Sequence, residues 1–424
     1  MKKILIPTLL LFIIIGLSSC LRDDCVSQRE YVIYNPVYLH VDQFRTSEIN
    51  VTASRTLENP GKLYFYQNYL LINEQAHGIH VYDVQDRTNP VEVAFYNIAG
   101  NFDMAIKDDV LFADNVVDLL AIDITNITNP TIISRYENFN EVWEPEDQRY
   151  HAYNVKSNQV EIVDCSDPDF GRNNFWRGGV FFNEFDVAAE SFGDVVAPGG
   201  SGGSNVGIGG SFARFTIAMD HLYTVNEFSL NVWTFHGNEL SKENTNNLGW
   251  GIETIFPYED KLFIGSNSGM FIFDNSNPVA PVMLSAFEHA RACDPVVVSG
   301  NTAYVTLRNG SECEGFVNQM DVVDVTSLTN PRLIKSYPMT NPHGLSVLGD
   351  RLYLGEGPYG FRILDVSDPN DVERLVHFED LATYDVIALS DSEIFIIGED
   401  GFYLMDASNI NNIKILSHIQ VERS

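Results

Sequence analysis

The chain has 424 residues and a formal net charge of −32, from 26 Lys and Arg against 58 Asp and Glu. A field of that sign repels phosphate backbones, so nucleic acid is excluded as an expected partner. Three readings of the acidity stay open, namely solubility alone, attraction of cations and attraction of basic partners.

Residues 1–20 have the three parts of a secretion signal. Lys2 and Lys3 supply the charge, Ile4–Ile15 the apolar stretch, and Leu17–Cys20 a small-residue cleavage site that ends in Cys. This order resembles a bacterial lipoprotein signal, in which the Cys20 thiol would be acylated, for example by palmitate, and become the mature N-terminus. Several acyl chains suffice for stable anchoring, so the predicted partner at this end is the membrane lipid.

Residues 21–56 are predicted to form a tether and lead-in segment. Acidic Asp23 and Asp24 follow Cys20 closely, which resembles the signal that sends some lipoproteins to the outer face of the outer membrane. A solvated linker is the alternative, and the periplasmic face is then the expected location. Tyr31–Val41 is strand-like enough to pack on the main domain or to extend it.

A phrase of about forty residues recurs along the rest of the chain, and its anchor is an Asp that closes an apolar strand. In four copies a Pro follows seven positions after that Asp. Short runs of β-branched and aromatic residues between Asp, Asn, Gly and Pro are strand and turn signals. Because a turn explains the Asp by itself, we interpret these carboxylates as structural. The anchors are Asp83, Asp123, Asp274, Asp324, Asp365 and Asp406.

A repeat of this length with four short strands predicts an all-β fold, a β-propeller over residues 57–420. About seven blades can be counted, including a weaker copy over Ala213–Leu240 that has Thr234 in place of Asp. An eighth blade is the alternative, because Asp164 ends a similar phrase in phase. The acidic, Pro-containing stretch Val142–Tyr150 argues against it, since an innermost strand should be apolar.

The third-strand phrases of the repeat resemble a known family. Ile162–Asp164, Val322–Val325 and Ile363–Val366 look like the LVIVD repeat of bacterial and archaeal surface proteins. The lead-in phrase around Pro36 and the stretch beginning at Asn59 also resemble lipoproteins of that family. The resemblance implies a β-propeller and transfers no catalytic residue.

Four cysteines follow Cys20. Export allows bridges, and we expect a disulfide between Cys293 and Cys313, which would lie at the same end of one blade. A zinc site is not expected, because neither belongs to a close pair with ligand spacing. The sequence gives no geometry for Cys25 and Cys165.

A long insertion over residues 137–211 is the most individual part of the chain. Loops of this length in compact domains are functional or disordered, so binding, cover and disorder all stay open. Trp143 and Trp176 offer flat apolar faces that would stack on sugars or anchor a protein partner.

Propellers bind at the mouth of the central channel, where the innermost strands begin. The polar residues near those starts are the binding candidates, with hydrogen bonding between blades as the alternative reading. They are Asn101, Asp103, Arg214, Glu253, Asp294, His343 and Asp385. No catalytic, cofactor or metal motif is recognised.

The sequence therefore predicts a surface-tethered lipoprotein whose propeller is a non-catalytic binding or interaction module for an unknown protein or glycan. Fold alone does not decide function, so two alternatives stay open. One is an extracellular enzyme acting on a polysaccharide or peptide at the channel mouth. The other is a structural subunit of an outer-membrane assembly.

Overall fold

A computed structural model describes residues 28–52, 54–139, 147–165, 167–170, 174–184, 206, 208–209, 213–249, 251–267, 269–288, 295–308 and 317–422. Apart from one short helix, the elements of these residues are β-strands. They divide into two compact units, Met1–Pro36 with Asn154–Val187 and Val37–Tyr153 with Ala188–Ser424.

The part of the chain that the structure describes contains no helix that is both long and apolar enough to span a membrane.

The first unit is built on one antiparallel sheet with the strand order β11-β1-β13-β12. Tyr31 and Val163 are buried in its small core, and Gly178 and Gly179 take positive φ in the hairpin turn between β12 and β13. The phrase that ends at Asp164, the candidate for an eighth blade, is the end of β11 in this sheet. The bounds are β1 (Gln28–His40), β11 (Arg149–Asp164), β12 (Asn174–Arg177) and β13 (Val180–Glu184).

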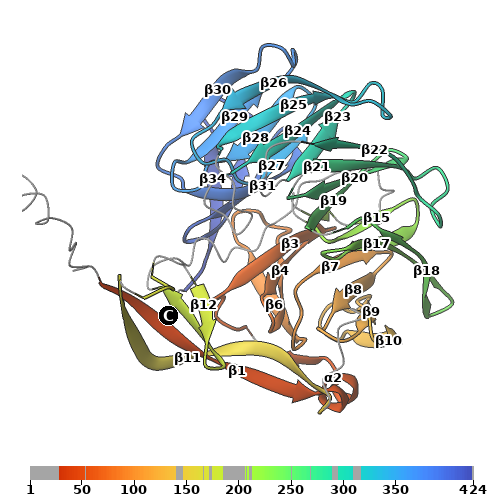
Figure 1. Ribbon diagram of the computed structural model, residues 1–424, viewed down its shortest axis with the longest axis vertical. Helices are drawn as coiled ribbons and strands as arrows, with labels where there is room; N and C mark the ends of the chain where they lie inside the picture. The colour runs from red at the N-terminus through yellow and green to blue at the C-terminus, as the bar shows by residue number, and fades with distance from the viewer. Residues whose placement is uncertain are drawn as a thin grey trace, which may run out of the picture. The chain divides into compact units, whose positions relative to one another are not determined.

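The second unit is a propeller, and its described residues form seven blades (Figure 1). Blade 1 has six strands in the order β14-β3-β4-β5-β6-β2, because two short segments extend its edges. Its strands are β2 (Asn50–Thr52), β3 (Pro60–Tyr66), β4 (Tyr69–Glu74), β5 (Gly78–Asp83), β6 (Val91–Asn97) and β14 (Ile208–Gly209). The strand expected over Tyr31–Val41 is β1, which pairs with β13 of the first unit, whereas the edge of blade 1 is extended by β2.

The other six blades are four-stranded meanders. Blade 2 consists of β7 (Met104–Lys107), β8 (Val110–Asp114), β9 (Leu119–Asp123) and β10 (Thr131–Tyr136), and blade 3 of β15 (Phe215–Ala218), β16 (His221–Val225), β17 (Ser229–His236) and β18 (Glu239–Asn247). Blade 4 consists of β19 (Ile252–Tyr258), β20 (Lys261–Ser266), β21 (Gly269–Asp274) and β22 (Val282–Glu288), and blade 5 of β23 (Val296–Ser299), β24 (Thr302–Leu307), β25 (Gln319–Asp324) and β26 (Arg332–Pro338). Blade 6 consists of β27 (Leu345–Leu348), β28 (Arg351–Gly355), β29 (Phe361–Asp365) and β30 (Glu373–Phe378), and blade 7 of β31 (Thr383–Ser390), β32 (Glu393–Gly398), β33 (Gly401–Asp406) and β34 (Lys414–Gln420).

The recurring Asp residues are turn formers, as the sequence indicates. Each ends the third strand of its blade and accepts a hydrogen bond from the backbone N–H two residues on, for example Thr125 N to Asp123 Oδ1 at 2.8 Å and Ser367 N to Asp365 Oδ1 at 2.9 Å. This is the local bonding by which Asp fixes a turn. The anchors are therefore occupied by backbone and are not ligand groups.

Blade 3 shows what happens without the Asp. Its third strand runs past Thr234 to His236, and only two residues separate it from β18, which begins at Glu239. Gly237 and Asn238 have φ values of 59° and 64°, the conformation of a two-residue hairpin turn. A Gly-Asn hairpin thus replaces the Asp turn.

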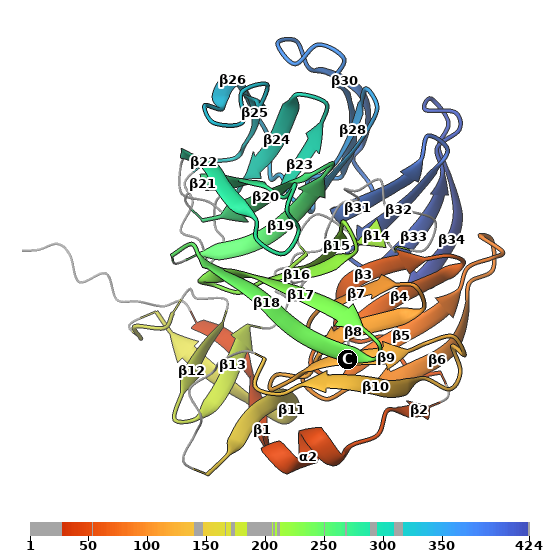
Figure 2. The same cartoon turned by 90° about the vertical axis from the view of Figure 1, so that its right-hand side faces the viewer.

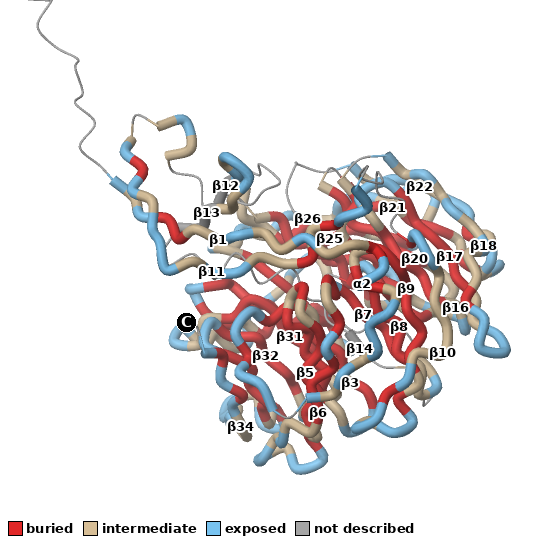
Figure 3. Tube along the Cα trace, turned by 90° about the horizontal axis from the view of Figure 1, so that it is seen from below, coloured by how far each residue is buried: buried red, intermediate tan, exposed pale blue. Residues whose placement is uncertain are grey.

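The apolar cores join the blades into a closed ring. Successive buried clusters link blades 1 to 3, 3 to 4, 4 to 6, 6 to 7, and finally 7 to 1. At the closure Phe65 contacts Phe395, Ser417 Oγ donates to Arg87 O at 2.7 Å, and the two blades lie side by side in Figure 2. Buried residues follow the inner strands, whereas outermost strands such as β22 are exposed or half-buried (Figure 3).

Helix α2 (Val41–Thr46) is fixed to blade 2 by a buried acid. Arg45 Nη2 lies 3.2 Å from Asp118 Oδ1, and Arg135 Nη1 lies 2.9 Å from Asp118 Oδ2. Two cations around one fully buried carboxylate compensate for the loss of hydration of that carboxylate.

Candidate functional site

A cavity of about 280 Å³ opens at the end of the propeller where first strands begin and second strands end. Blades 1 to 4 all contribute to it. Its lining residues are Gly61, Lys62, Asn73, Gln75, Phe102, Asp103, Asp114, Phe139, Arg214, Phe215, Val225, Asn226 and Glu253. Of the nine binding candidates taken from the sequence, Asp103, Arg214 and Glu253 line this cavity.

Two buried carboxyl groups lie side by side in the wall that blade 2 provides. Asp114 Oδ1 accepts hydrogen bonds from Asn101 Nδ2 at 2.9 Å, Phe102 N at 2.7 Å and Asp103 N at 3.0 Å. Asp114 Oδ2 takes part in none of these bonds. Burial, together with the nearby Asp103 charge, raises the pKa of Asp114 to about 7.

Asp103 has a structural task besides lining the cavity. Its Oδ1 accepts from Met104 N at 2.7 Å and its Oδ2 from Arg214 N at 2.8 Å, so it ties blade 2 to the start of blade 3. Burial raises the pKa of Asp103, while Lys62 and these N–H groups act in the opposite direction. Asp103 therefore joins blades 2 and 3 and also lines the cavity, and ligand binding by Asp103 stays a prediction.

The accessible part of the lining mixes charge, amide and aromatic groups. Arg214 is exposed, and among the described residues no side chain pairs with its guanidinium group. Lys62 and Glu253 are half-buried, as are the amides Gln75 and Asn226. Phe102 is 47% exposed, which is unusual for a ring in a cavity wall. The arrangement can donate and accept hydrogen bonds and can stack on a flat ligand face.

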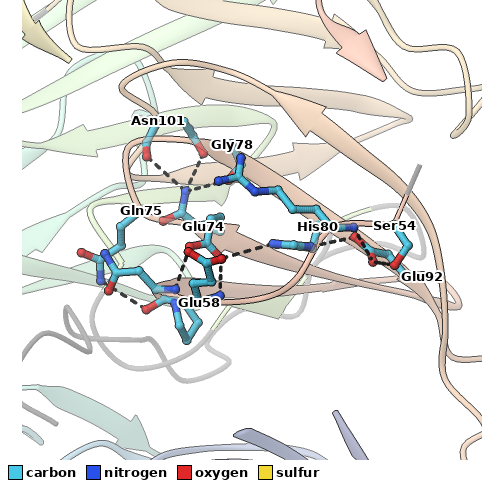
Figure 4. A network of polar contacts seen from close by, with 12 residues as sticks. Ser54, Glu58, Glu74, Gln75, Gly78, His80, Glu92 and Asn101 are labelled. Carbon is cyan, nitrogen blue, oxygen red and sulfur yellow. Dashed lines mark hydrogen bonds and ion pairs between the residues drawn. The ribbon is translucent and has the colours of Figure 1, made fainter. Parts of the chain in front are cut away.

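Behind this wall two amides hold blades 1 and 2 together. Asn73 Nδ2 donates to Asn101 Oδ1 at 2.7 Å and also reaches Gly78 O, as Figure 4 shows. Gly61 lies directly against Asn73, because a Cβ at Gly61 would lie 2.4 Å from Asn73 Oδ1. Asn101 is fully buried, so it supports the cavity wall without lining the cavity.

In blade 1 the buried His80 of β5 lies between Glu74 of β4 and Glu92 of β6, an arrangement that we call the His80 clamp (Figure 4). His80 Nδ1 lies 2.7 Å from Glu92 Oε1, and His80 Nε2 lies 3.2 Å from Glu74 Oε2. The same carboxyl groups accept hydrogen bonds from the end of the lead-in segment and the residues just after it. Ser54 Oγ donates to Glu92 at 2.6 Å, and Glu58 N donates to Glu74 at 3.1 Å. Burial alone would lower the pKa of His80, but its hydrogen bonds to Glu74 and Glu92 outweigh burial and raise it. The clamp fixes the lead-in segment beside the cavity wall.

His343 and Asp385 lie in blades 6 and 7 and do not line the cavity. The His343 ring packs edge-on against Tyr384, with 5.0 Å between centroids, and its carbonyl accepts from Thr306 Oγ1 at 2.9 Å. Burial, with the nearby Arg308 charge, lowers the pKa of His343 well below its usual value. Asp385 lies against Gly344, where a Cβ would lie 1.8 Å from Asp385 Oδ1. Both residues are part of the packing between blades.

The remaining sequence candidates are distributed elsewhere. Trp176 is in β12 of the first unit, where it is 49% exposed and its ring lies 5.4 Å from that of Phe181. The 137–211 insertion is thus partly a set of paired strands, whose partner β1 is distant in sequence. Outside the described residues lie Trp143, Asp294, Cys20, Cys293 and Cys313. Cys165 is the only cysteine within them.

Sequence reasoning missed the cavity residues Lys62, Gln75, Phe102, Asp114 and Asn226. Three of these, Gln75, Asp114 and Asn226, close or directly follow a second strand, and a polar residue occupies the equivalent place in other blades, such as Arg308 and Glu356. The repeat phase was therefore a signal that could have identified them. Sequence reasoning used only the starts of first strands.

Comparison with known proteins agrees with this architecture. The model of the family described as LVIVD repeat matches residues 105–138, 290–339 and 342–372. No curated protein sequence matches the chain.

Solved structures resemble the chain in fold at low sequence identity. A functionally unknown protein from Desulfotomaculum acetoxidans is 13% identical with a TM-score of 0.53, covering 84% of this chain and 98% of its own. A periplasmic gluconolactonase from Pseudomonas aeruginosa is 10% identical with a TM-score of 0.53, covering 85% and 96%. A protein from Lactobacillus plantarum is 10% identical with a TM-score of 0.52, covering 86% and 97%. At these identities the likeness concerns the fold. The chain therefore contains LVIVD repeats, and its described residues form a β-propeller.

Proposed function

We propose that this protein is a lipid-anchored binding module of the outer membrane, and that its propeller binds a ligand in the cavity formed by blades 1 to 4. The observation that carries the proposal is this cavity, with polar groups from four blades and an exposed aromatic ring. Concave sites with a few convergent polar groups are the usual places of ligand binding. The binding candidates Asp103, Arg214 and Glu253 line it.

The test of binding is a glycan and peptide array probed with the purified full-length protein. Arg214→Gln combined with Glu253→Gln removes two charges from the cavity and leaves a polar amide at each position. Glu373→Gln combined with Arg374→Gln makes the same changes at exposed sites of β30 and is the matched control. We expect the first pair to abolish the array signal and the second to preserve it. Equal signals from both would contradict the proposal.

The anchor rests on the residues that lead to Cys20. The signal-like order of Lys2, Lys3, the apolar stretch and Leu17–Cys20 supports it, and the acidic Asp23 and Asp24 support the outward-facing location. Cys20→Ala should remain uncleaved and take up no radioactive palmitate, whereas the wild type takes it up. Protease added to intact cells should digest the anchored protein. Palmitate incorporation by the variant would rule out Cys20 as the anchor.

A second candidate function is an enzyme that acts on a polysaccharide or peptide in the same cavity. It is favoured by the adjacent buried carboxyl groups of Asp103 and Asp114, of which Asp114 has a pKa of about 7, suited to proton transfer near neutral pH. A panel of chromogenic glycosides and peptides tests it. Turnover that Asp114→Asn abolishes would favour the enzyme, and binding without turnover favours the binding module.

A further inference from the structure

We infer that the cavity formed by blades 1 to 4 takes one neutral sugar residue, either free or as part of a glycan. The inference rests on the proposed function, since it assumes that this cavity is the binding site. Three properties of the cavity support the inference. They are its volume, the balance of charges in its lining, and the combination of the exposed Phe102 with hydrogen-bond donors and acceptors.

The volume limits the ligand to a small one. Drug-sized ligands occupy pockets of about 300–1,000 Å³, and this cavity of about 280 Å³ lies just below that range. It therefore suits a single ring with its substituents rather than a folded peptide segment. The rest of a longer glycan would lie outside the mouth.

The charges of the lining nearly cancel. Two basic side chains, Lys62 and Arg214, line the cavity together with the acids Asp103, Asp114 and Glu253. Burial raises the pKa of both Asp103 and Asp114, that of Asp114 to about 7, which weakens the negative charge of the lining near neutral pH. An anionic ligand would face three carboxyl groups and a cationic one two basic side chains. Neither sign of ligand charge gains from the lining as a whole, and a neutral ligand avoids both penalties.

The polar groups match hydroxyl groups, which donate one hydrogen bond and accept two. Asp114 Oδ2 is an acceptor that the structure leaves outside the three bonds made by Oδ1. Arg214 offers guanidinium donors that pair with no side chain among the described residues, and Gln75 contributes an amide. A ligand with several hydroxyl groups can use acceptors and donors together.

Phe102 supplies the apolar half of the site. Phe102 is 47% exposed as a residue, although its backbone N–H donates a hydrogen bond to Asp114 Oδ1 at 2.7 Å. The backbone is thus fixed while the ring stays open to a ligand. One face of a pyranose ring carries mainly C–H groups, so it can cover an aromatic ring and remove apolar surface from water.

The experiment is isothermal titration of the full-length protein with three ligand sets: methyl pyranosides of neutral hexoses, the matching uronic acids, and free amino acids. We expect a neutral pyranoside to bind more tightly than its uronic acid. Phe102→Ala should weaken this binding about 3- to 10-fold. Tyr359→Ala, which removes another exposed ring from the second-to-third-strand loop of blade 6, should leave it unchanged.

Asp114→Asn tests the free oxygen without removing the support of the wall. The amide oxygen can still accept the three bonds now made to Oδ1, while an NH₂ group replaces Oδ2. We expect at least a fivefold loss of affinity for the neutral sugar and an unchanged melting temperature.

The outcomes separate this inference from the proposed function. Binding of uronic acids or amino acids alone, weakened by Arg214→Gln, overturns the neutral sugar and keeps the cavity as the site. If the sugar binds equally well to Phe102→Ala and to Asp114→Asn, both the sugar inference and the cavity as the binding site are overturned. No binding in any set overturns the sugar inference, while the array result decides the proposed function.

Discussion

The polar residues at the starts of first strands have different surroundings in the cavity of blades 1 to 4 and in blades 6 and 7. Near the cavity, Asp103, Arg214 and Glu253 at the starts of first strands line open space. In blades 6 and 7, His343 and Asp385 occupy comparable positions but are buried against Tyr384 and Gly344. A polar residue at this place in the repeat therefore either lines a cavity or packs between blades, according to its neighbours.

The histidines show the same contrast. His80 in blade 1 is buried between Glu74 and Glu92, which raise its pKa, whereas His343 in blade 6 is buried among apolar and cationic neighbours, which lower its pKa. The surroundings of His80 thus favour the charged imidazolium, and those of His343 favour the neutral imidazole. Both are buried, so burial alone does not give the protonation state.

The largest expected effect comes from breaking the His80 clamp. His80→Leu leaves two buried carboxylates without their cation, which should cost about 3–5 kcal/mol in the free energy of unfolding. Chemical denaturation of the full-length protein measures this loss. His236→Leu, an exposed site on β17, is the control and should change it by about 0.5 kcal/mol or less. A similar loss in both variants would mean that the clamp is not a stabilising ion pair.

The second largest effect is expected at Asp103, which both ties blade 2 to blade 3 and lines the cavity. Asp103→Ala removes the acceptor of Met104 N and Arg214 N, and each buried unsatisfied donor costs about 1–3 kcal/mol. We expect a loss of about 2–4 kcal/mol, measured by denaturation, and a smaller one for Asp103→Asn, which keeps one oxygen. A loss below about 0.5 kcal/mol would remove the structural role of Asp103.

His343→Leu probes the polar residues of blades 6 and 7. A neutral, apolar side chain of similar size should cost less than about 1.5 kcal/mol, because the imidazole already behaves as a neutral packing group. Affinity for the array ligand should be unchanged. Loss of binding with a normal melting temperature would instead bring His343 into the ligand site and erase the contrast between the cavity of blades 1 to 4 and blades 6 and 7.

The smallest effects are opposite slopes in the pH dependence of stability. The raised pKa of His80 means that its contribution is complete below pH about 6.5 and is lost as pH rises through the folded value. The lowered pKa of His343 means that its contribution is present above pH about 6.5 and is lost as pH falls. In plots of melting temperature against pH, His80→Leu should reduce the fall on the alkaline side, and His343→Leu should reduce the fall on the acidic side. A change on the same side in both variants would contradict these assignments.

The ring could be predicted from the sequence because its signals are local. Each anchor Asp accepts a hydrogen bond from a backbone N–H two residues away, so neighbouring residues determine the turn. The weak copy of the repeat in blade 3 keeps the same phase. The pairing of β1 with β13 could not be predicted, since Tyr31 and Glu184 meet across a long sequence separation. Alternation of residues within one strand does not identify its partner.

The site was predictable only in part, for a related reason. The positions of Asp103, Arg214 and Glu253 in the repeat could be read from the sequence, but the cavity beside them could not, because it depends on side chains from four blades. The His80 clamp needs three residues from different strands to converge in a buried place. Such convergence has no fixed spacing within a repeat.

Hydrogen–deuterium exchange of the full-length protein, with and without the ligand found on the array, shows directly whether the ligand occupies the cavity of blades 1 to 4. We expect bound ligand to slow exchange in peptides containing Gly61–Lys62, Phe102–Asp103 and Val225–Asn226, and to leave those around His343 and Asp385 unchanged. Slower exchange confined to blades 5 to 7 or to the first unit, with none around the cavity, would contradict it.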